Sequence, residues 1–123
     1  MNKEEIRTSK APLPGGPYSQ GIKAGQHIYV AGQRPVDAAT GMIPDDLASQ
    51  ARLCLENVRH VLEAAGATME NVTSVTVYLA DIGHFAAFNE IYKEYFAAPY
   101  PARTTVSCSL RGILVEVNAI AVL

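Results

Sequence analysis

The sequence contains few of the residues that carry metal, redox or thiol chemistry. Its 123 residues include only 2 cysteines and 3 histidines. Cys54 and Cys108 form no CxxC pair, and we expect both to be buried free thiols. His27, His60 and His84 lie far apart, without the spacing of metal ligands, and are expected at the surface or at element ends. The sequence therefore predicts no metal centre and no nucleophilic cysteine.

An excess of charge of one sign and long apolar runs are also missing. With 10 basic and 12 acidic residues the net charge is −2, and the scattered basic residues predict no nucleic-acid surface. No apolar run approaches the length that spans a bilayer. The N-terminus carries charged residues and then prolines, which is unlike a signal peptide. We expect a cytoplasmic protein with a single domain over residues 1–123.

Several motifs with well-understood chemistry do not occur. GxGxxG, GxxxxGK[ST], HExxH and GxSxG are all absent. Gly15-Gly16-Pro17 is glycine-rich, but no helical pattern follows it, so it is a poor phosphate cradle. Any chemistry must therefore come from polar side chains held in rigid or apolar surroundings.

Hydrophobic periodicity predicts six strands and two helices. A short edge strand is expected within residues 1–10, and a short polar-apolar segment follows at 18–22. Residues rich in β-formers predict further strands at 27–31, 72–80, 104–109 and 114–123. One amphipathic helix begins after Asp45 or Asp46 and ends before Gly66; a second, capped by Asp81, ends at Pro99. The order β-β-β-α-β-α-β-β predicts an α+β fold with two helices on one face of a mixed sheet.

The last strand indicates that the other face of the sheet is also covered. Its alternate residues Val115, Val117, Ala119 and Ala121 give one apolar face, while Glu116, Asn118, Ile120 and Val122 share the other. A strand with so little polar content is expected at the centre of a sheet, covered on both sides. Two helices cover only one side, so the second cover is most simply another copy of the chain.

The stretch from Pro99 to Val106 holds an arginine at the end of a stiff lead-in. Pro99 and Pro101 restrict the backbone and deliver Arg103 to the start of a strand, on the same face as Thr105. A guanidinium in a fixed position suits bidentate capture of a carboxylate or phosphate. The alternative is a solvated arginine at a strand end.

Two further polar residues lie in apolar patterns. The second helix has an apolar face whose predicted members are Phe85, Phe88, Tyr92, Tyr95 and Phe96. Asn89 lies at the edge of that face and needs partners, either in a structural hydrogen bond or in a pocket wall. Glu116 is either a buried, paired carboxylate or lies at an exposed strand end. An arginine with a carboxylate that steers a water molecule is a minimal hydrolytic site, but the residues alone indicate only an α+β domain with a candidate anion site.

Six segments, in order along nearly the whole chain, resemble the motifs of the reactive intermediate deaminase (RidA/YjgF) family. They are Gly16-Pro17-Tyr18-Ser19-Gln20-Gly21, Ala31-Gly32-Gln33, the helix segments Leu55–Val58 with Ala64–Gly66, Phe85–Asn89, Tyr100-Pro101-Ala102-Arg103 and Val115–Ala121. The resemblance implies a chorismate-mutase-like fold and a homotrimer with sites between subunits. It also implies hydrolysis of reactive enamines and imines such as 2-aminoacrylate, released by pyridoxal-phosphate enzymes, to 2-keto acids and ammonia. No cofactor or metal is implied.

The resemblance also implies roles for particular residues. Arg103 would hold the substrate carboxylate, Glu116 would orient or activate the attacking water, and Tyr18 would line the pocket and help to hold the water or substrate. The remaining pocket groups would be Gly32, Thr105, Asn89 and Phe85.

The chain departs from the family pattern at several positions. Ala31, Arg34, Thr105 and Asn118 replace a common serine, an apolar residue, a frequent cysteine and a usual glutamate, and the turn at 109–113 looks shorter. Rate and substrate range therefore stay open. The alternative function is a non-catalytic small-molecule-binding or chaperone-like homotrimer. The acidic balance argues against the ribonuclease or translation-inhibitor activity that is sometimes attributed to such proteins.

Overall fold

The computed structural model describes residues 2–123 and contains one mixed six-stranded sheet with two α-helices. The elements are β1 (Glu4–Ile6), β2 (Gly21–Ala24), β3 (His27–Gln33), α1 (Leu47–Ala64), β4 (Val72–Leu79), α2 (Phe85–Tyr92), β5 (Ala102–Ser107) and β6 (Val115–Val122). Short 3₁₀ turns at Met69–Asn71 and Ile82–His84 precede β4 and α2. The predicted element order and the α+β class are confirmed.

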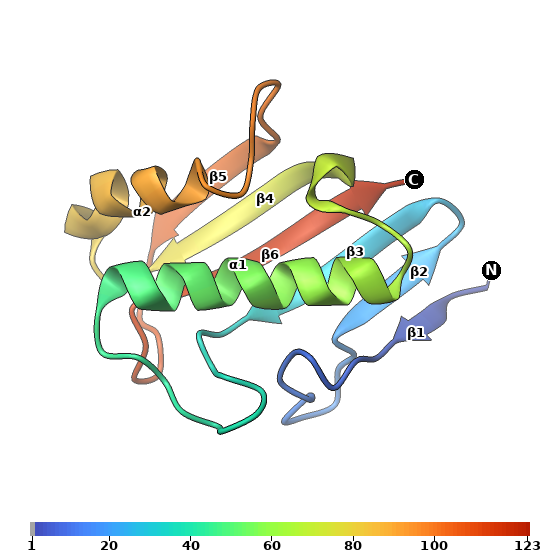
Figure 1. Cartoon of the computed structure of the whole chain (residues 1–123), viewed down its shortest axis with the longest axis horizontal. Coiled ribbons are helices and arrows are strands. Elements are labelled where there is room, and N and C mark those ends of the chain that lie inside the picture. Colours follow the sequence, from blue (N-terminus) through green and yellow to red (C-terminus); the bar gives the residue numbers. More distant parts are fainter. Residues whose placement is uncertain (1) are drawn as a thin grey trace.

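The strands lie in the order β1-β2-β3-β6-β4-β5, with only the β4–β5 pair parallel. Both helices pack on the same face of this sheet (Figure 1). The last strand in the sequence, β6, lies between β3 and β4, which confirms its predicted central place. The two edges are β1 and β5, so Arg103 lies on an edge strand.

Helix α1 forms where the sequence predicts it, because both of its ends carry clear signals. The side chain of Asp46 accepts a hydrogen bond from the Ser49 N–H and caps the first turn. The apolar stripe of the helix is buried against the sheet. Gly66 has a φ of +85°, the left-handed conformation that ends many helices.

The core lies between the helices and one face of the sheet. Inward residues of β6 and β4, such as Val117 and Val77, are almost completely buried beneath Leu55 and Phe88 of the helices. On the opposite face the alternate residues of β6, from Glu116 to Val122, are only half-buried. Neither helix covers that second face (Figure 1).

Helix α2 is shorter than predicted. It ends at Tyr92, seven residues before Pro99, because the next N–H groups, of Glu94 and Tyr95, donate to carbonyls three residues back rather than four. Asp81 caps the 3₁₀ turn through the Gly83 N–H rather than the helix itself.

Two side chains predicted to be buried are exposed. Phe85 is 43% exposed because it opens α2 at the margin of the core, where its ring lies over the Arg103 guanidinium. Cys108 is exposed because β5 has already ended at Ser107, whereas Cys54 is buried as expected. Within residues 2–123, no helix combines the length and apolar character needed to cross a membrane.

Candidate functional site

Arg103 lies on the helix-covered side of β5 and points toward α2. It is aligned with Val75 of β4, whose side chain belongs to the core, and it is itself half-buried. Its Nη2 donates a hydrogen bond of 2.6 Å to Oδ1 of Asn89. Asn89 is therefore partly buried and has a partner, as the sequence predicts, and the pair links the start of β5 to α2.

Three aromatic rings of α2 surround the guanidinium. The Arg103 Cζ lies 4.7 Å from the centroid of Tyr92, 5.5 Å from that of Phe85 and 5.6 Å from that of Phe88. Each distance is within the range of a cation–π contact. Within residues 2–123, no carboxylate lies within 4.0 Å of the Arg103 nitrogens. The guanidinium is thus held by rings and one amide oxygen, with N–H groups left for an anion.

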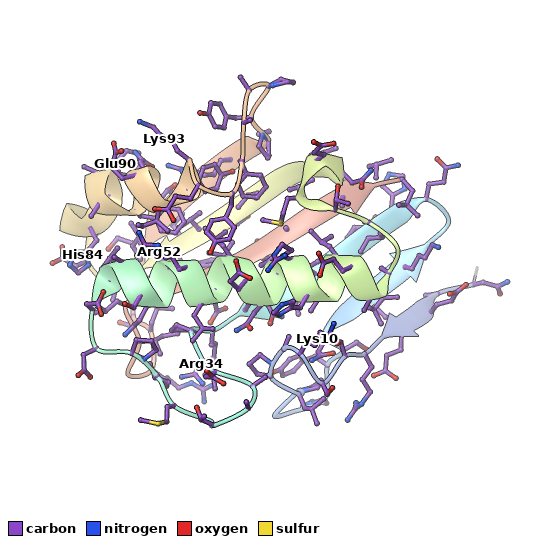
Figure 2. All side chains as sticks on the ribbon, viewed as in Figure 1. Lys10, Arg34, Arg52, His84, Glu90 and Lys93 are labelled. Atoms are coloured by element: carbon purple, nitrogen blue, oxygen red, sulfur yellow. The ribbon has the colours of Figure 1, made fainter. Side chains whose placement is uncertain are left out.

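An open cleft of about 410 Å³ borders this arginine. Its lining includes Arg103, Asn89 and Tyr92, together with Tyr100 and Pro101. Figure 2 labels two more lining residues, Glu90 and Lys93, which project from α2 and form an exposed ion pair of 3.3 Å.

Tyr92 is a member of this site that the sequence analysis assigned only to the core. Its ring is the nearest of the three to the guanidinium, and burial raises the pKa of its hydroxyl while the Arg103 charge opposes that rise. Among residues 2–123 the buried hydroxyl has no hydrogen-bond partner. The helical spacing from Asn89 to Tyr92 was the signal that places both side chains on one side of α2.

Thr105 lies on the same face of β5 as Arg103, two residues further on, and is aligned with Val77. Its side chain is half-buried, but it does not line the cleft beside Arg103.

A second group of predicted residues gathers around Gly32 at the end of β3. A Cβ added to Gly32 would collide with Oε2 of Glu116, so the carboxylate lies directly against this glycine. Tyr18 and Gly32 both line a cleft of about 420 Å³. Arg34, labelled in Figure 2, lines the same cleft and donates a hydrogen bond of 3.1 Å to the Arg111 carbonyl.

The two groups lie on opposite faces of the sheet. Arg103 is aligned with Val75, whereas Glu116 is aligned with Tyr78, and these two β4 residues point to opposite sides. Strand β4 also separates β5 from β6. One chain therefore brings Arg103 together with Asn89 and Phe85, and Glu116 with Gly32, but does not join the two groups.

Neither the buried Cys54 nor a metal-ligand cluster adds to these two groups in the described residues 2–123. Burial raises the pKa of the Cys54 thiol well above its usual range, and its Sγ lies 3.5 Å from the Val115 carbonyl oxygen, which suits an inert core thiol. Within residues 2–123, no group of three or more His, Cys, Asp or Glu side chains is placed to hold a metal ion.

The fold and the placement of these groups define a class of protein: a small α+β chain with one helical layer and an arginine cleft beside an edge strand. Residues 8–123 match the family model described as Endoribonuclease L-PSP. The chain belongs to this family, the RidA/YjgF family of reactive intermediate deaminase homologues.

Similarity to individual relatives extends over nearly the full length. A RutC family protein of Pyrococcus abyssi is 48% identical over 124 residues, which cover 98% of each chain. A protein of Bos taurus named 2-iminobutanoate/2-iminopropanoate deaminase is 42% identical over 120 residues, 95% of this chain and 88% of the relative. The crystal structure of E. coli TdcF with bound serine has a TM-score of 0.92 and 40% identity, and covers 98% of each chain. These likenesses confirm the resemblance found in the sequence.

Proposed function

We propose that this chain is an enamine/imine deaminase of the 2-iminobutanoate/2-iminopropanoate type. Its substrates would be reactive 2-imino acids and their enamine tautomers, and its products 2-keto acids and ammonia. The observation that carries the proposal is the Arg103 guanidinium, half-buried among three rings and without a carboxylate partner in residues 2–123. The named deaminase at 42% identity supports the same reaction.

In the proposed reaction Arg103 holds the substrate carboxylate through charge-assisted hydrogen bonds. An enamine first takes a proton on carbon and loses one from nitrogen, which converts it to the imine. Glu116 orients a water molecule, whose oxygen adds to the imine carbon while a proton passes to the nitrogen. The carbon–nitrogen bond then breaks as the hydroxyl proton passes to the nitrogen, so ammonia leaves and the carbon keeps the oxygen as a ketone. Tyr18 helps to hold the water or the substrate.

The proposal includes a homotrimer with its sites between subunits. Arg103 and Glu116 point to opposite faces of one sheet, so they can act on the same substrate only if they come from different chains. The second sheet face, which neither helix covers, supplies a surface for such contacts (Figure 1). A cytoplasmic location stays a prediction.

The other proposed pocket residues would shape the site rather than take part in the reaction. Gly32 would present backbone groups beside Glu116, and Thr105 would do so beside Arg103, while Asn89 and Phe85 would complete the wall. The family description names an endoribonuclease, but a net charge of −2 with scattered basic residues argues against binding of a phosphate backbone.

The test is release of ammonia and keto acid from an imine made in place by an amino-acid oxidase. Arg103→Ala should lower the rate constant at limiting substrate by at least about tenfold, because a hydrogen bond to a charged group contributes roughly 1.5–3 kcal/mol. The matched control is Arg7→Ala, which removes an exposed arginine paired only with Glu5 at 3.6 Å. Equal rates for wild type and Arg103→Ala would exclude the proposed role.

Glu116→Gln separates catalysis from binding. A deaminase should lose hydrolysis in this variant while pyruvate still binds at Arg103. If the wild type shows no imine hydrolysis and Glu116→Gln binds pyruvate unchanged, the non-catalytic small-molecule-binding alternative is correct.

A further inference from the structure

Strand β3 has a bulge at the point where it meets the proposed water-orienting carboxylate. Between Val30 and Gln33 its pairing with β6 shifts, because two residues of β3 lie there opposite one residue of β6. In the unshifted register Gly32 would lie opposite Val117, on the core face of the sheet. The bulge moves Gly32 to the other face, where it lies against the carboxylate of Glu116.

Asn57 of α1 holds the chain directly after this bulge. Its side chain is 1% exposed, and its Nδ2 donates hydrogen bonds of 3.1 Å to the carbonyls of both Arg34 and Val36. Both carbonyls lie beyond Gln33, where β3 ends. One amide group therefore uses its two N–H bonds to fix the segment that follows Gly32.

Gln50, seven residues earlier in the same helix, holds the start of β6. It is 3% exposed, and its Oε1 accepts a hydrogen bond of 2.8 Å from the Leu114 N–H while its Nε2 donates one of 2.7 Å to the Pro44 carbonyl. Leu114 directly precedes β6 and lies two residues before Glu116. Because seven residues are close to two helical turns, Gln50 and Asn57 lie on the same side of α1, which packs over β3 and β6 (Figure 1).

These two amides interrupt the buried apolar stripe of α1. Burial of an amide costs free energy unless its groups are paired. Here the partners are main-chain groups of the same chain, so the amides secure the course of the backbone on both sides of the contact between Gly32 and Glu116. The contacts lie beneath α1, so association of chains through the opposite face of the sheet leaves them in place (Figure 1).

We infer that Gln50 and Asn57 are positioning residues for Glu116. They fix the ends of β3 and β6, and so hold the Glu116 carboxylate against the bulge at Gly32. The inference rests on the proposed function in one respect: Glu116 orients the attacking water. Neither amide touches the substrate or the water. A shift of about 1 Å in the carboxylate would slow the reaction by up to about a hundredfold, while Arg103, on the other face of the sheet, would still bind the substrate.

The first experiment compares turnover with binding in Asn57→Leu and Gln50→Met, which probe the two strand ends separately. Turnover per pyruvate-binding site, counted by calorimetry, should fall by at least about tenfold, while the affinity for pyruvate changes by less than about twofold. The matched control is Val61→Ala, at a buried α1 residue that packs near Gly21. It should lower stability and leave turnover per site unchanged, since unfolding removes binding sites and turnover together.

The second measurement does not depend on hydrolysis. A Cβ built on Gly32 would lie 3.4 Å from Cγ of Glu116, so NMR should show a nuclear Overhauser signal between the α-protons of Gly32 and the γ-protons of Glu116. Val61→Ala should keep this signal, and Asn57→Leu should lose it. Wild-type turnover per site in both amide variants, or an unchanged signal in both, would overturn the inference. A wild type that hydrolyses no imine would refute the proposed reaction, and loss of the signal in Asn57→Leu would still support the positioning role.

Discussion

The guanidinium of Arg103 lies 4.7 Å from the Tyr92 centroid and donates to Asn89 at 2.6 Å, so its plane is fixed from two directions. A lysine at this position keeps the charge but has no planar fork to stack on rings and bind a carboxylate through two bonds. Arg103→Lys should therefore weaken pyruvate binding by about tenfold, as measured by calorimetry. Wild-type affinity in this variant would show that charge alone is sufficient.

Replacement by alanine should have different effects at two glycines, on activity at the half-buried Gly32 and on stability at the buried Gly21. At Gly32 the added methyl meets the flexible end of the Glu116 side chain, which can move away. At Gly21 it would lie 2.8 Å from Val61 Cγ1 and 3.2 Å from Ile6 Cβ, inside the core.

Gly32→Ala should therefore lower imine hydrolysis by at least about tenfold through a displaced carboxylate. Its free energy of unfolding should change by less than about 1 kcal/mol. Gly21→Ala should instead lose about 1–3 kcal/mol of stability through overpacking. Urea melts and ammonia assays on both variants separate the two effects. A Gly32→Ala protein with full activity would contradict the placement of Glu116 in the site.

At the scale of the element, the start of α1 should be sensitive to acid. The pKa of Asp46 is lowered from 3.8, first because its carboxylate accepts a hydrogen bond from the Ser49 N–H. The stabilisation from this cap is thus fully present above pH 3.8, and is lost as pH falls through the lower folded-state pKa.

Asp46→Asn is the matched variant, because asparagine also caps a helix but does not titrate. At neutral pH we expect the variant to unfold at a urea midpoint close to that of the wild type. As the pH falls below 3.8, the midpoint of the wild type should drop further than that of the variant. Parallel curves for the two proteins across this range would show that the Asp46 charge has no part in the cap.

The elements with complete local signals could be predicted from the sequence, and those that depend on distant contacts could not. The sequence of α1 has an N-cap at Asp46, a stripe of apolar residues and a terminating glycine at Gly66, and the helix forms at the expected residues. α2 was predicted too long because Tyr95 and Phe96 continue the apolar pattern, although the backbone hydrogen bonds have already changed to three-residue spacing at Glu94. Apolar periodicity alone does not reveal where a backbone leaves the helix.

The candidate site shows the same division. Asn89 and Arg103 could each be picked out from the sequence as candidate polar groups, but their hydrogen bond depends on how α2 packs beside β5. The opposite orientations of Arg103 and Glu116 depend on β4 lying between β5 and β6, a long-range pairing that no local pattern encodes. The contact of Tyr92 with the Arg103 guanidinium was not predicted, because an aromatic residue in the apolar stripe of a helix is expected to be a core residue.

For the whole molecule, the face of the sheet opposite the helices should control assembly. Ile120 of β6 lies on that face, aligned with Tyr29, which is 44% exposed. A carboxylate here would be buried without a partner when chains associate, at a cost of several kcal/mol. Ile120→Asp should therefore convert the proposed trimer into single chains of 13.2 kDa, as measured by light scattering. Met42→Asp, at a loop residue that is 70% exposed, is the control and should leave the mass unchanged.

The strongest test of the shared site uses two inactive variants together. Arg103→Ala lacks the proposed carboxylate anchor and Glu116→Ala lacks the group proposed to orient water, so each variant alone should be inactive. If every site takes Arg103 from one chain and Glu116 from its neighbour, unfolding and refolding an equal mixture rebuilds some intact sites. Random assembly gives about one intact site in four, so activity should return to about a quarter of wild type. If both residues acted within one chain, no intact site could form, and the mixture would stay as inactive as its parts.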